Sequence, residues 1–240
     1  MGWWQPLLVT VLVFLFFEVG YLWAGAGHLP HSAWHAATWL DRQIPLVPFF
    51  ILFYMLGYFF VLSPAFILRR REEFQAGIAV FVLMLGCAFL IFHFFPVYMQ
   101  KQIAYGSDFF SSLTRYQQRM DVPYNNLPSL HVTLNLYAWL LIFSHTSRKA
   151  LWWLPLPICI VLSTVLVKQH LLLDLLGGLL LAAAGFCLWR WLRGQSWVRF
   201  AYWSALAVVL VTLLGNAERI RQGIAIAGGL LGQAVGLGEN

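Results

Sequence analysis

Long runs of apolar residues, separated by short polar segments, dominate this chain. The apolar runs lie at about 5–24, 47–68, 75–95, 130–146, 151–168, 170–189 and 198–215. About 20 predominantly apolar residues are enough to cross a bilayer as a helix. The pattern therefore predicts an all-α integral membrane protein, with a bundle of six core transmembrane helices plus a seventh at 198–215.

The composition supports a membrane protein. Of the 240 residues, 61% are hydrophobic and only 10% are charged, and the mean hydropathy of +0.74 is well outside the range of soluble globular proteins. The cysteines Cys87, Cys159 and Cys187 lie in apolar runs, where packing is a better explanation than a disulfide or metal framework. We expect one membrane domain over residues 1–240, which ends in a helix and a Gly-rich segment at 197–240.

The first apolar run has two interpretations. Ala24-Gly25-Ala26 resembles the cleavage site of a signal peptide. Against cleavage, the first five residues contain no lysine or arginine, and the run is long and includes Glu18. A retained first span is favoured, with Glu18 facing a neighbouring helix.

Basic residues predict the orientation of the chain in the membrane. If the spans alternate in direction, one side of the membrane receives the arginines at 69–71, together with Arg148, Lys149, Arg190, Arg193 and Arg199. By the positive-inside rule this side is cytoplasmic. The formal net charge of +6 is then explained by topology, and no nucleic-acid partner is expected. The loops at 25–46 and 96–129 lie on the extracytoplasmic side, together with His131 and His170.

Two polar motifs stand at the starts of apolar runs. The first is Pro128-Ser129-Leu130-His131, and the second is His170 followed four residues later by Asp174. Ionisable residues next to hydrocarbon are costly and are usually retained for function. On a helix, a carboxylate at i+4 can hold one imidazole nitrogen, which leaves the other free to attack phosphorus. An isolated His–Asp pair of this kind is more often structural, but the presence of Ser129 and His131 favours a catalytic role.

Ser129 is a suitable N-cap for the run at 130–146. The start of a helix offers free backbone N–H groups and the positive end of the helix dipole to a phosphate. His131 could protonate a leaving oxygen, although a lone histidine at this depth is more often a plain interfacial residue.

Phosphoryl transfer also needs fixed positive charge. The candidate cations on the same side are Lys101, Arg115, Arg119 and Lys168. Lys168 lies two residues before His170, where it could instead extend to the membrane interface. The two arginines could equally bind lipid head groups or be solvated.

These residues carry a family resemblance. The chain resembles the type 2 phosphatidic acid phosphatase (PAP2) superfamily, whose three sequence blocks are KxxxxxxRP, PSGH and SRxxxxxHxxxD. The second block corresponds to residues 128–131. The third corresponds to Ser163-Thr164, five residues, His170, three residues and Asp174. The similarity covers approximately residues 40–185, which predicts a PAP2-like core at about 40–190.

The chain departs from the superfamily pattern at three places. Leu130 replaces the glycine of the second block, and Thr164 replaces the arginine of the third, for which Lys168 could substitute one turn along the helix. In the first block, Lys101-Gln102 aligns with the Arg-Pro end and Phe94 with the upstream lysine. The sequences of these blocks, and of the segment at 44–48 before the second apolar run, are similar to those of a branch resembling inositolphosphotransferases.

The resemblance implies roles for the site residues. His170 would form a phosphohistidine, Asp174 would orient His170, and His131 would protonate the departing alcohol. Ser129, Leu130, Lys168 and Lys101 would bind the phosphate, without a metal or other cofactor. His28, His31 and His35 have spacings that a metal could use, but an aromatic-rich interfacial loop explains them more simply.

Three functions remain open at this stage. A lipid phosphatase would pass the phosphoryl group to water, whereas a lipid phosphotransferase would pass a phosphoryl or phospho-head group to a second alcohol. A non-catalytic transporter or scaffold would place charges at mid-span, and Glu18 is the clear example here. We expect an enzyme acting on a phosphorylated lipid, with phosphatase narrowly favoured over transferase.

Overall fold

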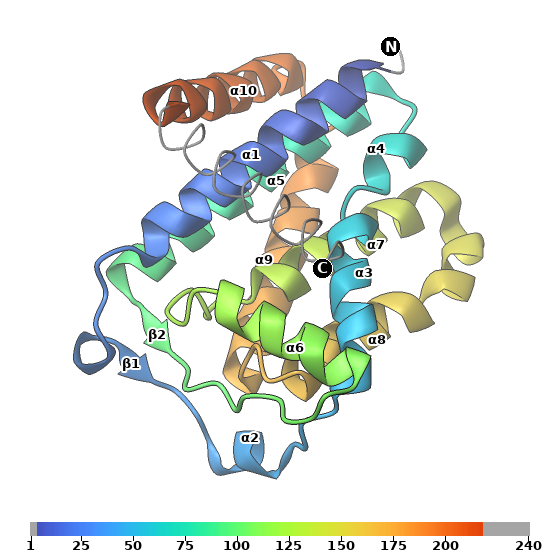
Figure 1. Cartoon of the computed structure of the whole chain (residues 1–240). Coiled ribbons are helices and arrows are strands. Elements are labelled where there is room, and N and C mark those ends of the chain that lie inside the picture. The colour runs from blue at the N-terminus through green and yellow to red at the C-terminus, as the bar shows by residue number, and fades with distance from the viewer. Residues whose placement is uncertain (1–3, 218–240) are drawn as a thin grey trace, which may run out of the picture.

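The structure, a computed structural model, describes residues 4–217 and is almost entirely helical (Figure 1). Within these residues, four helices are long and apolar enough to cross a membrane. They are α1 (Trp4–Gly25), α5 (Arg71–Phe94), α9 (Leu172–Leu192) and α10 (Val198–Gly215). The predicted all-α class agrees with this arrangement, but the predicted count of six core spans plus a seventh is not confirmed.

Three of the expected spans form shorter helices. The segment at 47–68 divides into η2 (Pro48–Phe50), α3 (Ile51–Phe60) and α4 (Pro64–Ile67). Pro64 lacks a backbone N–H, so a helix cannot run through it without losing a hydrogen bond. The other two are α7 (Leu130–Thr146) and α8 (Pro155–Leu166), which the 3₁₀ segment η3 (Ser147–Trp153) connects. The Gly-rich segment expected beyond residue 217 lies outside the described residues.

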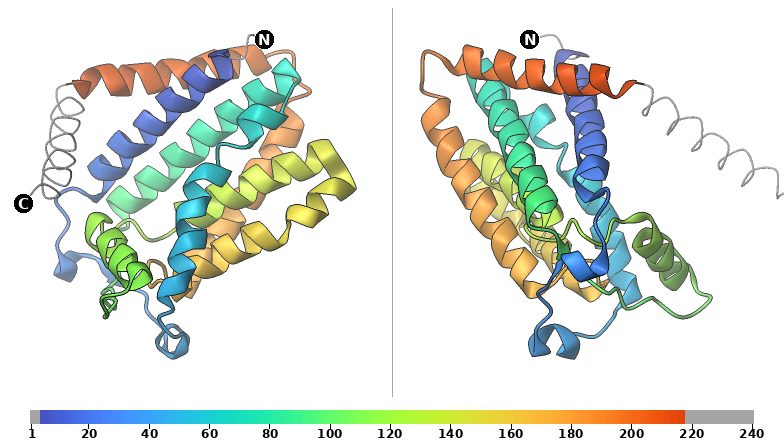
Figure 2. Two further views of the ribbon diagram at one scale, coloured as in Figure 1. Left: turned by 45° about the vertical axis from the view of Figure 1, so that its right-hand side comes forward. Right: turned by 90° about the vertical axis from the view of Figure 1, so that its left-hand side faces the viewer.

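The main core lies between α1, α5, α7, α9 and α10. Helix α5 packs against α1, α9 and α10, and α7 packs against α9 and α8 (Figure 2). Gly178 lies where α9 meets the start of α7, because a Cβ at this position would be 2.7 Å from the carbonyl oxygen of Ser129. The absence of a side chain therefore allows the two helices that carry the sequence motifs to lie in close contact.

Short elements gather at the end of the molecule where α9 begins (Figure 1). Strands β1 (Trp34–His35) and β2 (Val97–Tyr98) pair in parallel and connect two loops that are distant in sequence. Helix α2 (Trp39–Gln43) is capped by Thr38, and α6 (Phe109–Met120) by Asp108, each of which accepts a hydrogen bond from a backbone N–H of the first turn. These elements cover the end that carries His170.

The opposite end is held by a polar cluster around Glu73, near the start of α5. Its carboxylate lies 3.2 Å from Arg193 and 3.5 Å from His145, while its carbonyl oxygen accepts a hydrogen bond from the Trp189 indole. Since α9 has 21 residues, its two ends are about 31 Å apart at a rise of ~1.5 Å per residue. The arginines at 69–71 and Arg193 are thus at the far end from His170.

Candidate active site

His170 and Asp174 are adjacent in space, although not as two residues of one helix. His170 lies two residues before α9 begins, and Asp174 occupies its first turn. The Asp174 carboxylate turns back over the helix start, where it accepts a hydrogen bond of 2.8 Å from the Leu171 N–H and lies 3.5 Å from His170 Nδ1. The prediction that both residues lie on a helical face is therefore wrong, because the acidic side chain caps the helix that follows the histidine.

The start of α7 contacts this pair directly. The Ser129 hydroxyl accepts from the Val132 N–H at 3.3 Å, which is the N-cap interaction that the sequence predicts. The Ser129 N–H donates to the Asp174 carbonyl oxygen at 3.0 Å, so this amide is already occupied. At the first turn, Leu130 lines the adjacent cavity. A backbone hydrogen bond thus joins the two sequence motifs.

His131 is held by aromatic rings. Its imidazole stacks on Tyr54 of α3 with ring centroids 4.1 Å apart and an interplanar angle of 1°, and it meets the edge of Tyr58 at 5.3 Å. Any side chain at Gly57 would collide with His131 Nε2. This nitrogen is buried and has no hydrogen-bond partner among the described residues, so it is available to a ligand.

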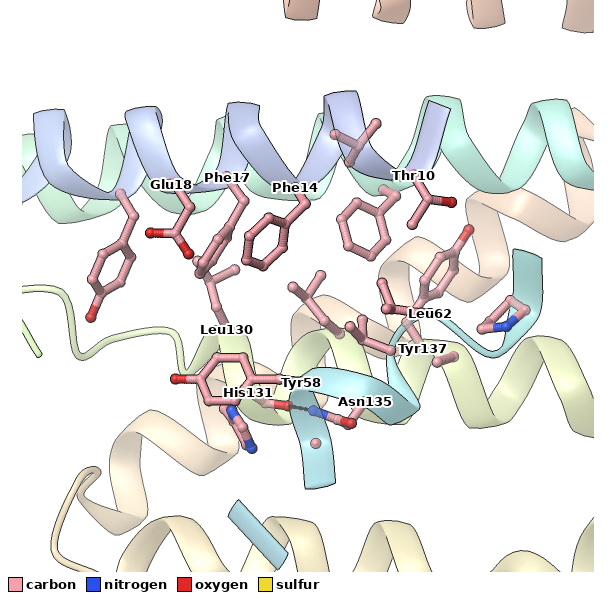
Figure 3. Close-up of a pocket in the computed structure, with 18 of the residues that line it drawn as sticks. Thr10, Phe14, Phe17, Glu18, Tyr58, Leu62, Leu130, His131, Asn135 and Tyr137 are labelled. Carbon is pink, nitrogen blue, oxygen red and sulfur yellow. Dashed lines mark hydrogen bonds between the residues drawn. The ribbon is translucent and has the colours of Figure 1, made fainter. Parts of the chain in front are cut away.

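His131 and His170 line one cavity of about 540 Å³ between α1, α3, α4, α5 and α7. One end is polar and includes both histidines and Asp121, while the remainder is mostly apolar. Figure 3 shows Phe14 and Phe17 of α1 facing this space from one side and Tyr58 and His131 from the other. An apolar cavity with a few converging polar groups is typical of a small-molecule or lipid site.

Lys168 contacts helix α2 rather than the cavity. Its ammonium donates to the Asp41 carbonyl oxygen at 2.9 Å, and it is not among the residues that line the cavity. Helix α8 ends at Leu166 and Lys168 adopts a left-handed φ of 55°, so it does not continue the helical face of Thr164. The prediction that Lys168 lies one helical turn beyond Thr164 on the same face is therefore wrong, because α8 ends before Lys168.

Asp41 connects α2 to the start of α9. One oxygen of its carboxylate accepts from the Leu172 N–H at 2.8 Å, and the other accepts from the Thr38 N–H at 2.8 Å. Burial acts to raise the pKa of Asp41, but these hydrogen bonds outweigh it and hold the pKa below its usual value. Burial also lowers the pKa of Lys168, which the nearby Asp41 carboxylate opposes. Asp41 thereby fastens the loop that carries His170.

Lys101 belongs to a second buried network. Its ammonium donates to the carboxylate of Asp121 and, at 2.6 Å, to Oε1 of Gln169, the residue before His170. The Tyr21 hydroxyl donates to the other oxygen of Asp121. Burial lowers the pKa of Lys101, and the Asp121 carboxylate opposes that shift. Lys101 therefore lies behind the loop that carries His170, and its charge is matched by Asp121.

The other cations and Thr164 do not line the cavity. The Arg115 guanidinium donates to the carbonyl oxygens of Ala104 and Gly106, which closes the loop before α6. Arg119 is exposed. The Thr164 carbonyl oxygen accepts from the N–H of both Gln169 and His170. Thr164 therefore shapes the turn that presents His170.

Four residues that the sequence motifs do not predict contribute contacts to the site from distant parts of the chain. Tyr21, Asp41, Tyr54 and Asp121 belong to α1, α2, α3 and the end of α6. Tyr21 is 100 positions before Asp121, Asp41 is 131 before Leu172 and Tyr54 is 77 before His131. No local spacing marks these contacts. The one available signal was polarity, since Asp41 and Asp121 are isolated carboxylates in loops on the side of the two histidines.

Comparison with known proteins adds one finding. A family model described as the PAP2 superfamily matches residues 23–188. The chain belongs to the PAP2 superfamily. Neither curated proteins nor solved structures provide a significant match. PAP2 proteins are generally phosphatases of all-α membrane type, so membership indicates a phosphatase-type activity and, with the four long apolar helices, an integral membrane protein.

Proposed function

We propose that this protein is an integral-membrane lipid phosphatase that acts through a phosphohistidine at His170. The observation that supports this most is the shared cavity, since His131 and His170 from two separate motifs line its polar end. The rest of the cavity is mostly apolar and suits the hydrocarbon part of a lipid. A phosphate at the polar end would reach both imidazoles.

The proposed reaction has two balanced steps. In the first, His170 attacks phosphorus, the bond from phosphorus to the lipid oxygen breaks, and His131 gives its proton to that oxygen. In the second, water attacks phosphorus, the bond between phosphorus and His170 breaks, His131 takes a proton from the water, and orthophosphate leaves. Asp174, 3.5 Å from His170 Nδ1, orients the ring and stabilises its positive charge.

Groups around the nucleophile supply the electrostatic part of the proposal. Helix α7 begins beside the polar end, where Leu130 lines the cavity, and we propose that free N–H groups of its first turn face the phosphate. Lys168 and Lys101 bracket the loop that carries His170, through Asp41 and Gln169 respectively. We propose that they add positive potential without metal participation, Lys168 more than Lys101, because Asp121 neutralises Lys101.

A panel of phosphorylated lipids tests the proposed reaction. Purified protein is incubated with phosphatidate, phosphatidylglycerol phosphate and a polyprenyl diphosphate, each with and without an added alcohol, while free phosphate and lipid products are measured. Release of orthophosphate supports the phosphatase. A new phosphorylated lipid that needs the added alcohol would identify a phosphotransferase, as in the branch that the sequence resembles. If none of the three lipids is consumed, both the phosphatase and the phosphotransferase are contradicted.

We also propose that the site faces the extracytoplasmic side, because the basic residues gather at the end of α9 that is distant from His170. Single cysteines can test this in a protein whose three native cysteines are replaced by alanine. Tyr105→Cys lies at the site end and Trp152→Cys on the other side, and both positions are strongly exposed. An impermeant maleimide added to intact cells should label the first variant and spare the second; the reverse pattern would refute the orientation.

A further inference from the structure

The cavity contains hydrogen-bond acceptors that have no partner. Asn135, one turn beyond His131 on α7, donates its Nδ2 to the His131 carbonyl oxygen at 2.7 Å, and its Oδ1 is buried without a partner among residues 4–217. Since a carbonyl oxygen cannot donate, this contact fixes which end of the amide is open. The residue is only 2% exposed.

Asn125 repeats the arrangement near the polar end. Its Nδ2 donates to the Tyr21 carbonyl oxygen at 2.6 Å, and its Oδ1 is buried and unpartnered in the described part of the chain. Glu18 faces the cavity from α1, opposite α7 (Figure 3). No described residue forms a hydrogen bond or ion pair with its carboxyl group in this structure. Three residues around the cavity therefore offer oxygen atoms to a ligand.

The donors that line the cavity are mostly occupied. The hydroxyl of Thr10 donates to the Pro6 carbonyl oxygen at 2.8 Å, that of Tyr137 to the Gly77 carbonyl oxygen at 3.4 Å, and that of Tyr21 to Asp121. Tyr58 is different, because its hydroxyl accepts from Gln117 and keeps a proton to donate. It lies beside His131, at the level of the proposed phosphate.

We infer that the substrate lipid carries a hydrogen-bond donor, a hydroxyl or an amide N–H, which Asn135 accepts. Four residues of α-helix rise about 6 Å, so this donor lies a few bonds from the oxygen that His131 protonates. A buried acceptor without a partner is unfavourable, and a site built to receive a hydroxyl discriminates against the analogue that lacks it. A glycerolipid with both neighbouring oxygens esterified offers only acceptors and would leave Asn135 unpaired.

The inference rests on the proposed function, and a matched pair of lipids tests it. We would compare 1-acyl-lysophosphatidate, which has a free hydroxyl near the phosphate, with its 2-deoxy analogue. Wild-type protein should show a kcat/KM about tenfold to a hundredfold higher for the hydroxylated lipid. Asn135→Leu, which keeps the volume and removes the acceptor, should bring the ratio close to one, whereas Asn135→Asp should keep a preference for the hydroxyl.

Asn216→Leu is the matched control. Asn216 donates its Nδ2 to the Thr212 carbonyl oxygen four residues earlier, as Asn135 does to His131, but it is outside the cavity. The control should retain the wild-type ratio. If the wild type turns over both lipids equally, or if Asn135→Leu keeps the preference, the inference is wrong while the phosphatase proposal stands.

Binding provides a readout that does not need turnover. Dissociation constants of the two lipids are measured on His170→Ala protein, with and without Asn135→Leu, by native mass spectrometry. A preference for the hydroxylated lipid that depends on Asn135 supports the inference even if the chemistry proposed for His170 is wrong. Equal binding of the two lipids to the His170→Ala protein would overturn it.

Discussion

The two histidines of the cavity have opposite surroundings. The His170 side consists of polar contacts. Asp174 lies 3.5 Å from His170 Nδ1, and the N–H groups of Gln169 and His170 donate to the Thr164 carbonyl oxygen. The His131 side consists of rings, with Tyr54 stacked at 4.1 Å. An imidazole that must carry positive charge as a phosphohistidine benefits from a carboxylate, whereas one that must pass a proton benefits from a ring plane held firmly without a fixed counter-charge.

The difference extends to how each histidine is supported. The His170 loop is fastened by groups from α2 and α6, through Asp41 and the Lys101–Asp121 pair. His131 depends on packing, because the absence of a side chain at Gly57 provides the room for its imidazole. Damage to the first region should therefore change charge and orientation, and damage to the second should change ring position.

The strongest test of the comparison is His170→Ala. Since we propose that this residue forms the bond to phosphorus, the variant should have no measurable turnover under conditions where wild type releases phosphate. Phosphate release by purified protein measures the effect. A second measurement looks for labelled phosphohistidine in wild-type protein after an alkaline quench. Near wild-type turnover in the variant would refute the mechanism.

Asp174→Asn should have the next largest effect. The amide oxygen can still accept from the Leu171 N–H, so the helix start is kept while the negative charge beside His170 Nδ1 is lost. We expect kcat to fall by about 10³–10⁴-fold, the scale for an orienting carboxylate in a triad. Steady-state kinetics measure the decrease in kcat, and circular dichroism checks that the variant is folded. A fall of less than tenfold would mean that Asp174 only caps α9.

His131→Ala separates the proposed proton donor from the proposed nucleophile. We expect natural lipid esters to slow by about 10²–10⁴-fold, because a general acid contributes on that scale. A p-nitrophenyl phosphate ester, whose leaving group needs no proton, should partly rescue His131→Ala and should not rescue His170→Ala. The measurement is the turnover rate of each variant on the lipid ester and on the p-nitrophenyl ester. Equal rescue of both variants, or of neither, would contradict the separate roles proposed for His131 and His170.

Lys168→Ala tests the positive charge beside the nucleophile. Losing one electrostatic stabiliser should lower kcat/KM by about tenfold to a thousandfold, and Lys168→Arg should keep part of the activity because the charge remains. The Arg115→Gln variant is the control, since among residues 4–217 Arg115 bonds only loop carbonyl oxygens and a side-chain hydroxyl. Normal turnover by well-expressed Lys168→Gln would show that Lys168 serves only its contact with Asp41.

Tyr54→Leu should have the smallest effect of the series. Leucine keeps an apolar contact but removes the ring that lies flat against His131, so the imidazole can turn away from the reacting oxygen. We expect a decrease in kcat of about tenfold on lipid esters, with little change on the p-nitrophenyl ester, since stacking contributes on the order of 1 kcal/mol. An equal decrease on both substrates would point to general damage instead.

Sequence alone determined the helical membrane class and the two motifs, because hydropathy and short spacings are local properties. It also predicted Ser129 as the N-cap of α7. Tertiary structure decided where α8 and α9 end and begin, and so placed His170 ahead of a helix and Lys168 on Asp41. It also supplied Tyr54 and Asp121. Such contacts join positions far apart in the chain, and only the packing of helices decides which side chains meet.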